Sequence, residues 1–505
     1  MSDASAMPVQ KGHPPGLYMM FFAELWERFC YYGMRALLAF YVVQQFGKPQ
    51  EEASLSYGAF TALIYATGIF GGYVADRVLG YRRAIILGGL IMAAGEFALI
   101  IPNETAFLFG LAGIVVGNGL FKPNISTLVG KLYEPGDPRR DGGFTIFYMG
   151  INLGALLAPL ACVWIANLMG TPLFEADGVT PLLEEATGEQ LIEADYRFGF
   201  MMAGGGMLLG IITFVFGKGL LHGEGAAPEG REGFGPMIAV ILGCIVLTPG
   251  VYFLLAEKEW AGRLLVTLSV VILAYLLVTG IKLGAVVLQR TFALFILLFV
   301  NSLFWACFEQ AGNSLNFFAR DHVGKHGFFD PIFFQSVNST YILIFGPVFA
   351  WLWVWLSRRN RNPSIPTKFG LGLLQVGLGF GVCLLAIDAF DSKTVSMFVS
   401  LFLVYLLHTT GELCISPVGL SMVTKLAPAH MTGIVMGAWF LSISMGNFVA
   451  GLFSALAGES APEGEGAPLE GYVAAYTPIL YMACGAGILM LILSKPINKL
   501  MHGVK

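Results

Sequence analysis

The sequence predicts an all-α polytopic membrane protein built from two six-helix bundles and a two-helix insert. Its 505 residues are 56% hydrophobic and only 12% charged, whereas about 25% of the residues of an ordinary soluble domain are charged. Apolar stretches of about 20 residues recur along the chain, and in lipid such stretches must form helices. Glycine occurs 64 times, often in runs, and small residues let helices approach closely in lipid.

About fourteen spanning helices are predicted, because each needs about 20 mostly apolar residues. In chain order they lie near residues 16–46, 53–77, 81–102, 105–130, 141–169, 195–220, 235–256, 262–284, 290–318, 331–357, 367–388, 394–426, 431–457 and 471–500. The Gly- and Glu-rich stretch 221–234 is typical of a flexible connection. The predicted units are therefore a tail (1–15), a first bundle (16–220), a connection with a two-helix insert (221–289), and a second bundle with a short tail (290–505).

Basic residues indicate the orientation of these helices. With the N-terminus in the cytoplasm, 19 of the 29 lysines and arginines fall in cytoplasmic segments and seven in outer ones. This bias is typical of the cytoplasmic side of membrane proteins. Arg28, Arg35 and Lys122 are the remaining three, and they lie at membrane depth. The sequence therefore predicts a multi-pass membrane protein with both termini in the cytoplasm.

The first span carries an unusual run of charges, Glu24, Glu27, Arg28 and Arg35. Glu24, Arg28 and Arg35 follow one another, with Tyr32, at three- and four-residue steps, so they share a helix face. Each ion at the centre of a lipid-facing helix costs about 2.5 to 3.5 kcal/mol, so this face is expected to line a polar cavity inside the bundle. The alternative is that Glu24 and Arg28 form a purely structural pair within the helix.

Two further groups of buried charges lie in other spans. Lys122 precedes Pro123, which frees a carbonyl one turn earlier and is expected to open the helix locally. Lys122 could instead extend to the cytoplasmic interface, but about ten residues of apolar helix follow it. Glu309 and Glu412 lie deep in the second half, so ion pairs with these cations would have to join the two halves. Such pairs are suited to a gate.

The count of these charges indicates proton binding. Glu24, Glu27, Glu309 and Glu412 oppose only Arg28, Arg35 and Lys122. Burial favours the protonated form of a carboxyl and a neighbouring cation favours the ionised form, so a carboxylate that loses its cation partner takes up a proton.

Polar and aromatic side chains on the same spans are candidates for the lining of a cavity between the halves. Asparagine can hold an ammonium group or a peptide carbonyl, and tryptophan can form the wall of a side-chain pocket. Taken singly, each would more often be ordinary packing, and only their shared location favours a binding role. These candidates are Tyr65, Tyr148, Asn152, Trp305, Asn338, Ser416 and Trp439.

Other classes of site have little support in the sequence. The net charge of −4 gives no basic surface for nucleic acid. The seven cysteines lie in apolar stretches without CxxC pairs or histidines at metal spacing, so no metal and no cofactor are expected. No removable signal peptide is expected, because no short apolar segment with a cleavage site follows the polar start. No obligate protein partner is evident either.

Several motifs resemble those of the proton-dependent oligopeptide transporter family. The run Glu24-Leu25-Trp26-Glu27-Arg28-Phe29 is similar to the family's E-x-x-E-R-[FY] signature. Further similar segments are spread along the chain, and the resemblance covers essentially the whole of it, including the two-helix insert typical of bacterial members. They are Tyr32-Gly33-Met34-Arg35, Gly72 to Arg77, Gly117 to Asn124, Phe147 to Gly154, Phe308-Glu309-Gln310, Phe334 to Asn338, and Gly411 to Gly419.

The resemblance implies a major facilitator fold in the cell inner membrane that imports di- and tripeptides with protons by alternating access. It implies that Arg35 with Glu309 closes the outer side, and that Lys122 with Glu412 acts on the inner side. Proton coupling would involve Glu24, Glu27, Arg28 and Glu309. The implied peptide-binding residues are Arg28, Tyr32, Arg35, Tyr65, Lys122, Tyr148, Asn152, Trp305, Phe308, Asn338, Glu412, Ser416 and Trp439.

Within this set, the peptide carboxylate would meet the three cations Arg28, Arg35 and Lys122. The peptide ammonium group would meet Asn152, Asn338 and Glu412.

Two alternatives to peptide import remain open. A transporter of nitrate or another small anion would share the fold, but it would leave Glu412 and the two asparagines without an ammonium partner. The second alternative is a membrane hydrolase or a peptide receptor. The chain has no HExxH motif and no evident GxSxG motif, which disfavours a hydrolase. We therefore expect a secondary active transporter and not an enzyme.

Overall fold

The computed structural model describes residues 12–134, 137–174, 182, 192–426, 428, 431–459, 461 and 466–504. Helices dominate the described chain, and one pair of two-residue strands joins antiparallel between α5 and α6. The elements are α1 (Pro15–Phe46), α2 (Gln50–Val74), α3 (Tyr81–Leu99), α4 (Glu104–Lys131), α5 (Arg140–Leu168), β1 (Thr171–Pro172), β2 (Ile192–Glu193), α6 (Tyr196–Gly217), α7 (Phe234–Ala256), α8 (Lys258–Leu283), α9 (Ala285–Phe308), α10 (Ser314–Phe318), α11 (Phe334–Arg358), α12 (Ile365–Ala389), α13 (Val395–Leu426), α14 (Thr432–Gly458) and α15 (Leu469–Leu500).

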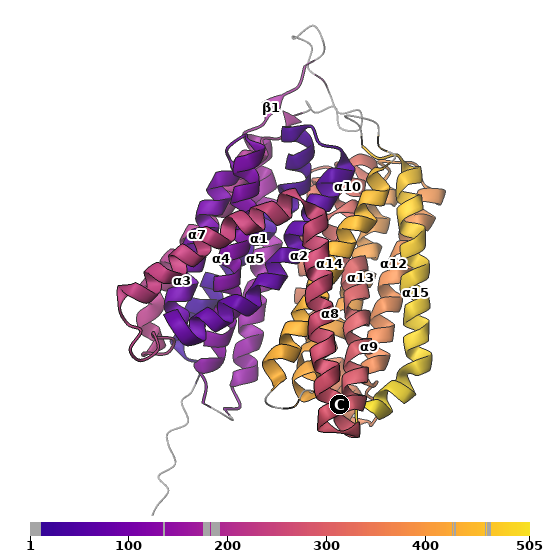
Figure 1. The fold of residues 1–505 in the computed structure, drawn as a ribbon. Helices are drawn as coiled ribbons and strands as arrows, with labels where there is room; N and C mark the ends of the chain where they lie inside the picture. Colours follow the sequence, from indigo (N-terminus) through magenta and orange to yellow (C-terminus); the bar gives the residue numbers. More distant parts are fainter. Residues whose placement is uncertain are drawn as a thin grey trace, which may run out of the picture.

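The helices form two bundles that stand side by side (Figure 1). Helices α1 to α6 make the first bundle, and α9 with α10 to α15 make the second. Short α10 continues the path of α9 after a 3₁₀ turn at Glu309–Gly312, so the two count as one crossing. The chain thus crosses fourteen times, which places both ends of the described chain on one side. We call this the terminus side, and the side with β1 and β2 the opposite side.

The two helices of the insert are divided between the bundles. Helix α7 runs obliquely over the first bundle, where Tyr252 stacks on Phe109 of α4 with ring centroids 4.3 Å apart. Helix α8 follows the second bundle, where Gly262 leaves room for Phe448 of α14. The two helices meet in an elbow at Glu257, on the opposite side. Most of their surface faces outward, which is expected of helices embedded in lipid.

The predicted all-α polytopic architecture of two six-helix bundles with a two-helix insert is confirmed. Twelve helical stretches of the described chain are long and apolar enough to cross a membrane. Helices α1 and α3 complete the fourteen, and α1 carries its four charges in the middle of the bundle. One boundary differs, because Gly284, with φ of 100°, separates α8 from α9. Helix α9 therefore begins at Ala285, inside the predicted insert (221–289).

The predicted local opening of the helix at Pro123 is wrong, because α4 continues through this residue to Lys131. The carbonyl of Gly119, which loses its usual donor at Pro123, lies directly against Gly71 of α2, where any Cβ would overlap it. Asn124 donates one hydrogen bond to the Gly71 carbonyl at 3.1 Å and one to the Leu120 carbonyl at 2.7 Å. Close packing and this amide together keep the helix intact.

Candidate functional site

Three of the four charges of α1 form a cluster with two residues of α4, and all of its members are buried except Lys122, whose side chain is 30% exposed. Arg28 donates from Nε and Nη2 to the two carboxylate oxygens of Glu27, both at 2.5 Å. Its Nε also lies 3.5 Å from Glu24. Lys122 pairs with Glu24, and Asn118 donates to Glu27 at 3.2 Å. We call these five residues the α1–α4 cluster. Its two carboxylates and two cations balance, which explains how fully buried glutamates are tolerated.

A second group of charges joins the two bundles. Arg35 of α1 lies 3.2 Å from Glu309, at the end of α9. The guanidinium carbon of Arg35 also lies 5.3 Å from the Tyr32 ring centroid and 5.9 Å from that of Tyr57. Because Arg28 lies 6.0 Å from the same Tyr32 ring, Tyr32 stands between the two arginines. The predicted Arg35–Glu309 contact is therefore present between the bundles in this conformation.

The second bundle presents a carboxylate that accepts a hydrogen bond from one neutral donor. Asn338 of α11 donates to Glu412 of α13 at 3.1 Å, and to the Thr409 hydroxyl at 3.0 Å. No cation pairs with Glu412 among the residues that the structure describes. One hydrogen bond from a neutral amide compensates little of the cost of a buried negative charge, so a proton or a cationic group would stabilise Glu412.

The predicted aromatic and polar candidates do not all have the same exposure. Trp305, Phe308 and Asn152 are buried, whereas 43% of the surface of Tyr148 is exposed. Tyr32, Tyr65, Asn338 and Ser416 are partly exposed. Trp439 is also buried, and it packs against Phe369 and over Gly419 inside the second bundle.

The predicted pair of Lys122 with Glu412 does not occur in the described conformation. Lys122 contacts Glu24 of its own bundle, and Glu412 contacts Asn338. The physical reason is that a cation takes the carboxylate nearest to it, and α1 packs beside α4 in the same bundle. A pair between Lys122 and Glu412 stays a prediction for a conformation in which the terminus side is closed.

Several residues of the site were missed from the sequence. Asn118 lies one turn before Lys122, and this i, i+4 spacing could have identified it. Tyr57 is fully buried beside Arg35 and had no such signal. Outside the site, Glu96 of α3 is fully buried, with the Cys30 thiol 3.4 Å away, and Lys368 of α12 lies buried over the Trp353 ring.

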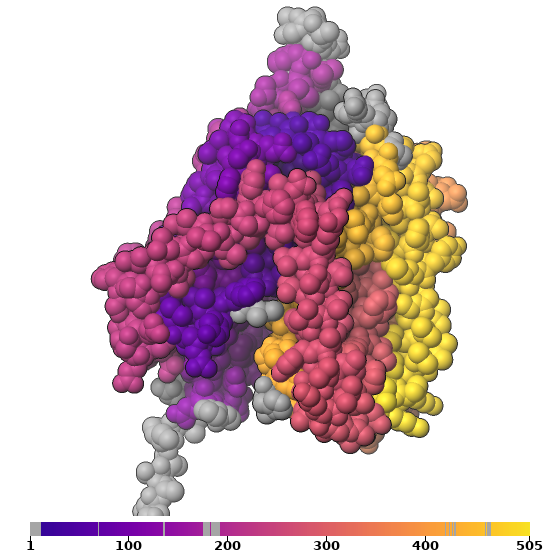
Figure 2. Space-filling model, in the orientation of Figure 1, coloured from indigo at the N-terminus to yellow at the C-terminus, as the bar shows by residue number. Residues whose placement is uncertain are grey.

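Contacts between the bundles gather on the opposite side. Asn313 donates to the Ser54 carbonyl at 3.0 Å, and Asn316 to the Ala36 carbonyl at 3.1 Å. Ser444 donates to Ala62 at 2.6 Å. Toward the terminus side the two halves part below the α7–α8 elbow (Figure 2). The described conformation is therefore closed on the opposite side, where Arg35 and Glu309 meet.

Gly58 of α2 and Gly451 of α14 touch across this closed interface. A Cβ on Gly58 would lie 2.6 Å from the Cα of Gly451. Overpacking of this kind costs about 1–3 kcal/mol, enough to shift a conformational equilibrium by about 5- to 150-fold. We expect Gly58→Ala to favour the conformation open on the opposite side. An impermeant maleimide should then label Gln50→Cys at this interface faster.

Gly68 on the same helix provides the matched control, because a Cβ there meets nothing within 4 Å. Equal labelling of the Gly58→Ala and Gly68→Ala variants would contradict a role of the Gly58–Gly451 contact in closure.

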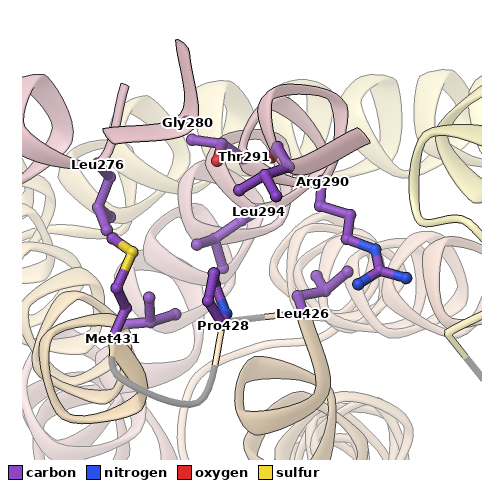
Figure 3. Close-up of a pocket in the computed structure, with 10 residues that line it drawn as sticks. Leu276, Gly280, Arg290, Thr291, Leu294, Leu426, Pro428 and Met431 are labelled. Carbon is purple, nitrogen blue, oxygen red and sulfur yellow. Dashed lines mark hydrogen bonds between the residues drawn. The ribbon is translucent and has the colours of Figure 1, made fainter. Parts of the chain in front are cut away.

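A small cavity lies apart from these charges, where α8 and α9 approach the ends of α13 and α14 (Figure 3). Leu276, Leu294, Leu426 and Met431 give it an apolar wall, and Arg290 lies at its edge. Its volume of about 10 Å³ is just enough for one water molecule. It is too small for an organic substrate. In the described part of the chain, no group of three or more metal-ligating side chains occurs.

This fold and these cross-bundle charges define a membrane transporter of the major facilitator type. The chain belongs to the POT family, whose model matches residues 82–467. Dipeptide and tripeptide permease B of Salmonella typhimurium is 32% identical over 502 residues, 97% of this chain and 96% of the relative. Dipeptide and tripeptide permease B of Edwardsiella piscicida is 34% identical over 86% of each chain. Proteins of this family are transporters rather than enzymes.

Solved structures share the whole fold. The crystal structure of peptide transporter POT in complex with sulfate is 36% identical, has a TM-score of 0.79 and covers 98% of this chain and 97% of its own. A mutant of peptide transporter POT in complex with alafosfalin is 35% identical, with a TM-score of 0.80 and the same coverage. The family resemblance noted in the motifs is thereby confirmed.

Proposed function

We propose that this protein is a proton-coupled symporter that imports di- and tripeptides across the cell inner membrane, with both termini in the cytoplasm. The observation that carries the proposal is the division of charge between the bundles. Arg28, Arg35 and Lys122 belong to the first bundle, and Glu412 with Asn338 to the second. A zwitterionic peptide could place its carboxylate against the cations of the first bundle and its ammonium group against Glu412 and Asn338 of the second. The relatives named as dipeptide and tripeptide permeases support the same cargo.

The geometry supports a sequence of events for the proposed cycle. A peptide carboxylate that approaches Arg28 and Lys122 competes with Glu27 and Glu24 for them. A carboxylate that loses its cation partner in a buried site takes up a proton. On the other side, the peptide ammonium supplies the positive charge that Glu412 lacks. Proton binding and peptide binding are coupled because both act on the same cations.

The two proposed gates act at different stages of this cycle. Arg35 and Glu309, 3.2 Å apart, hold the opposite side closed, which is the outer side in the proposed orientation. Protonation of Glu309 would remove one charge of this pair and let the outer side open. Lys122 and Glu412 would then meet as the terminus side closes. Rocking of one bundle against the other moves the site from one side to the other.

Uptake of dialanine into proteoliposomes tests the proposed function. We expect accumulation above the outside concentration when an inward proton gradient is imposed, and equilibration without it. Excess nitrate should not reduce the uptake of dialanine. Proton-independent accumulation would contradict the coupling, and inhibition by nitrate with no dialanine uptake would favour a transporter of small anions.

A further inference from the structure

Asn301 of α9 lies outside the proposed binding residues but is bonded to one of them. It is fully buried, and its Oδ1 accepts a hydrogen bond from the Trp305 indole Nε1 at 3.2 Å. Its Nδ2 donates to the Ser442 hydroxyl of α14 at 2.9 Å. Ser442 in turn donates to the Trp439 carbonyl at 2.7 Å. A chain of hydrogen bonds therefore fixes the amide, and the amide fixes the indole.

In the described conformation the Trp305 indole donates its N–H to Asn301 and is packed between neighbouring side chains and α14. Phe304 and Phe308 approach its ring edge-on, with centroids 5.6 Å and 5.3 Å away. On the side of its Cβ, α14 comes so close that only glycine fits at Gly446. An indole N–H that is buried without an acceptor is costly, so it turns toward any other acceptor within reach. Loss of the Asn301 acceptor would therefore remove the hydrogen bond that favours this orientation.

We propose that Asn301 is a positioning residue that sets which peptide side chains the transporter accepts, by holding the Trp305 indole in one orientation within the proposed peptide site. This inference rests on the proposed peptide transport and on the place of Trp305 in the binding site. Asn301→Leu keeps the size of the side chain but removes the acceptor. The freed indole would turn toward other acceptors in the proposed peptide site and take space from bulky peptide side chains. Small peptides would be affected less.

The test compares dialanine with alanyl-phenylalanine in proteoliposomes. We expect Asn301→Leu to raise the KM for alanyl-phenylalanine about fivefold more than the KM for dialanine, in line with the strength of one lost buried hydrogen bond. In a Trp305→Phe background, which has no indole N–H, the same substitution should change this ratio less than twofold. If the effect of Asn301→Leu depends on whether residue 305 is tryptophan, the two residues are energetically coupled. An equal effect in both backgrounds would overturn the proposal.

Ser454→Ala is the matched control for a merely structural role. Ser454 donates to Gln310 at 2.7 Å in the same seam between α9 and α14, and it does not contact Trp305. Its loss should lower the melting temperature without changing the KM ratio. If Ser454→Ala changes the KM ratio as much as Asn301→Leu does, the change in specificity comes from altered packing between α9 and α14 and not from the position of the indole. Failure of the proposed peptide transport can be told apart from failure of this inference, because the unmodified protein would then accumulate neither peptide.

Discussion

Glu27→Gln is expected to abolish proton-driven accumulation of dialanine while exchange of the peptide across the membrane continues. Glu27 holds Arg28 through two contacts of 2.5 Å and accepts a hydrogen bond from Asn118. Glutamine keeps the size of the side chain and its acceptor for Asn118, but it cannot bind and release a proton. Without that step the gradient cannot drive transport, whereas the bundles can still rock with peptide bound.

The measurement compares two assays on the same proteoliposomes. Accumulation is followed under an inward proton gradient, and exchange is followed with unlabelled dialanine inside and labelled dialanine outside. Accumulation by Glu27→Gln at the level of the unmodified protein would contradict the coupling role. Loss of both activities in a folded variant would assign Glu27 to peptide binding or to structure.

Glu96→Gln provides the matched control for Glu27. Glu96 is a buried carboxyl of the same bundle, and its described side-chain contact is the Cys30 thiol at 3.4 Å. It belongs to neither the α1–α4 cluster nor the Arg35–Glu309 pair. We expect both accumulation and exchange to persist in this variant. Loss of accumulation in Glu96→Gln as well would mean that any buried carboxyl of the first bundle is required, and the specific role of Glu27 would fail.

The architecture could be predicted because its causes are local. A run of about 20 apolar residues must be a helix in lipid, and four charges in one such run must face the interior. Both arguments hold for α1, whose Glu24, Glu27 and Arg28 are buried and paired. The start of α9 depended instead on the backbone of Gly284, and hydropathy carries no signal for a positive φ.

The partners of the charges could not be predicted in full, because they depend on the conformation. Lys122 can reach Glu24 in its own bundle, and it is predicted to reach Glu412 only when the terminus side closes. One sequence therefore encodes more than one set of ion pairs. Asn301 was missed for another reason. A single asparagine in an apolar stretch has no periodic signal, and its contact with Ser442 depends on the packing of α9 against α14.

Lys122→Gln is expected to remove both accumulation and exchange of dialanine, and to destabilise the protein. The variant removes the cation that pairs with Glu24, so this carboxyl must either stay ionised beside Arg28 or take up a proton, and either outcome lowers stability. Removal of one partner of a fully buried pair costs about 3–5 kcal/mol. Because the Lys122 side chain is 30% exposed and Glu24 can take up a proton, we expect a smaller loss, visible as a lower melting temperature. If Lys122 also binds the peptide carboxylate, exchange is lost for a second and separate reason.

The double variant Lys122→Gln/Glu24→Gln separates these two reasons. It restores the charge balance of the cluster, so we expect its melting temperature to return close to that of the unmodified protein. Exchange should stay absent, because no lysine is present to meet the peptide carboxylate. We expect the Glu24→Gln single variant to lose accumulation but retain exchange. Retained exchange would show that loss of Glu24 alone does not prevent peptide binding. Exchange restored in the double variant would mean that Lys122 only balances the charge of Glu24, and its place in the peptide site would be withdrawn.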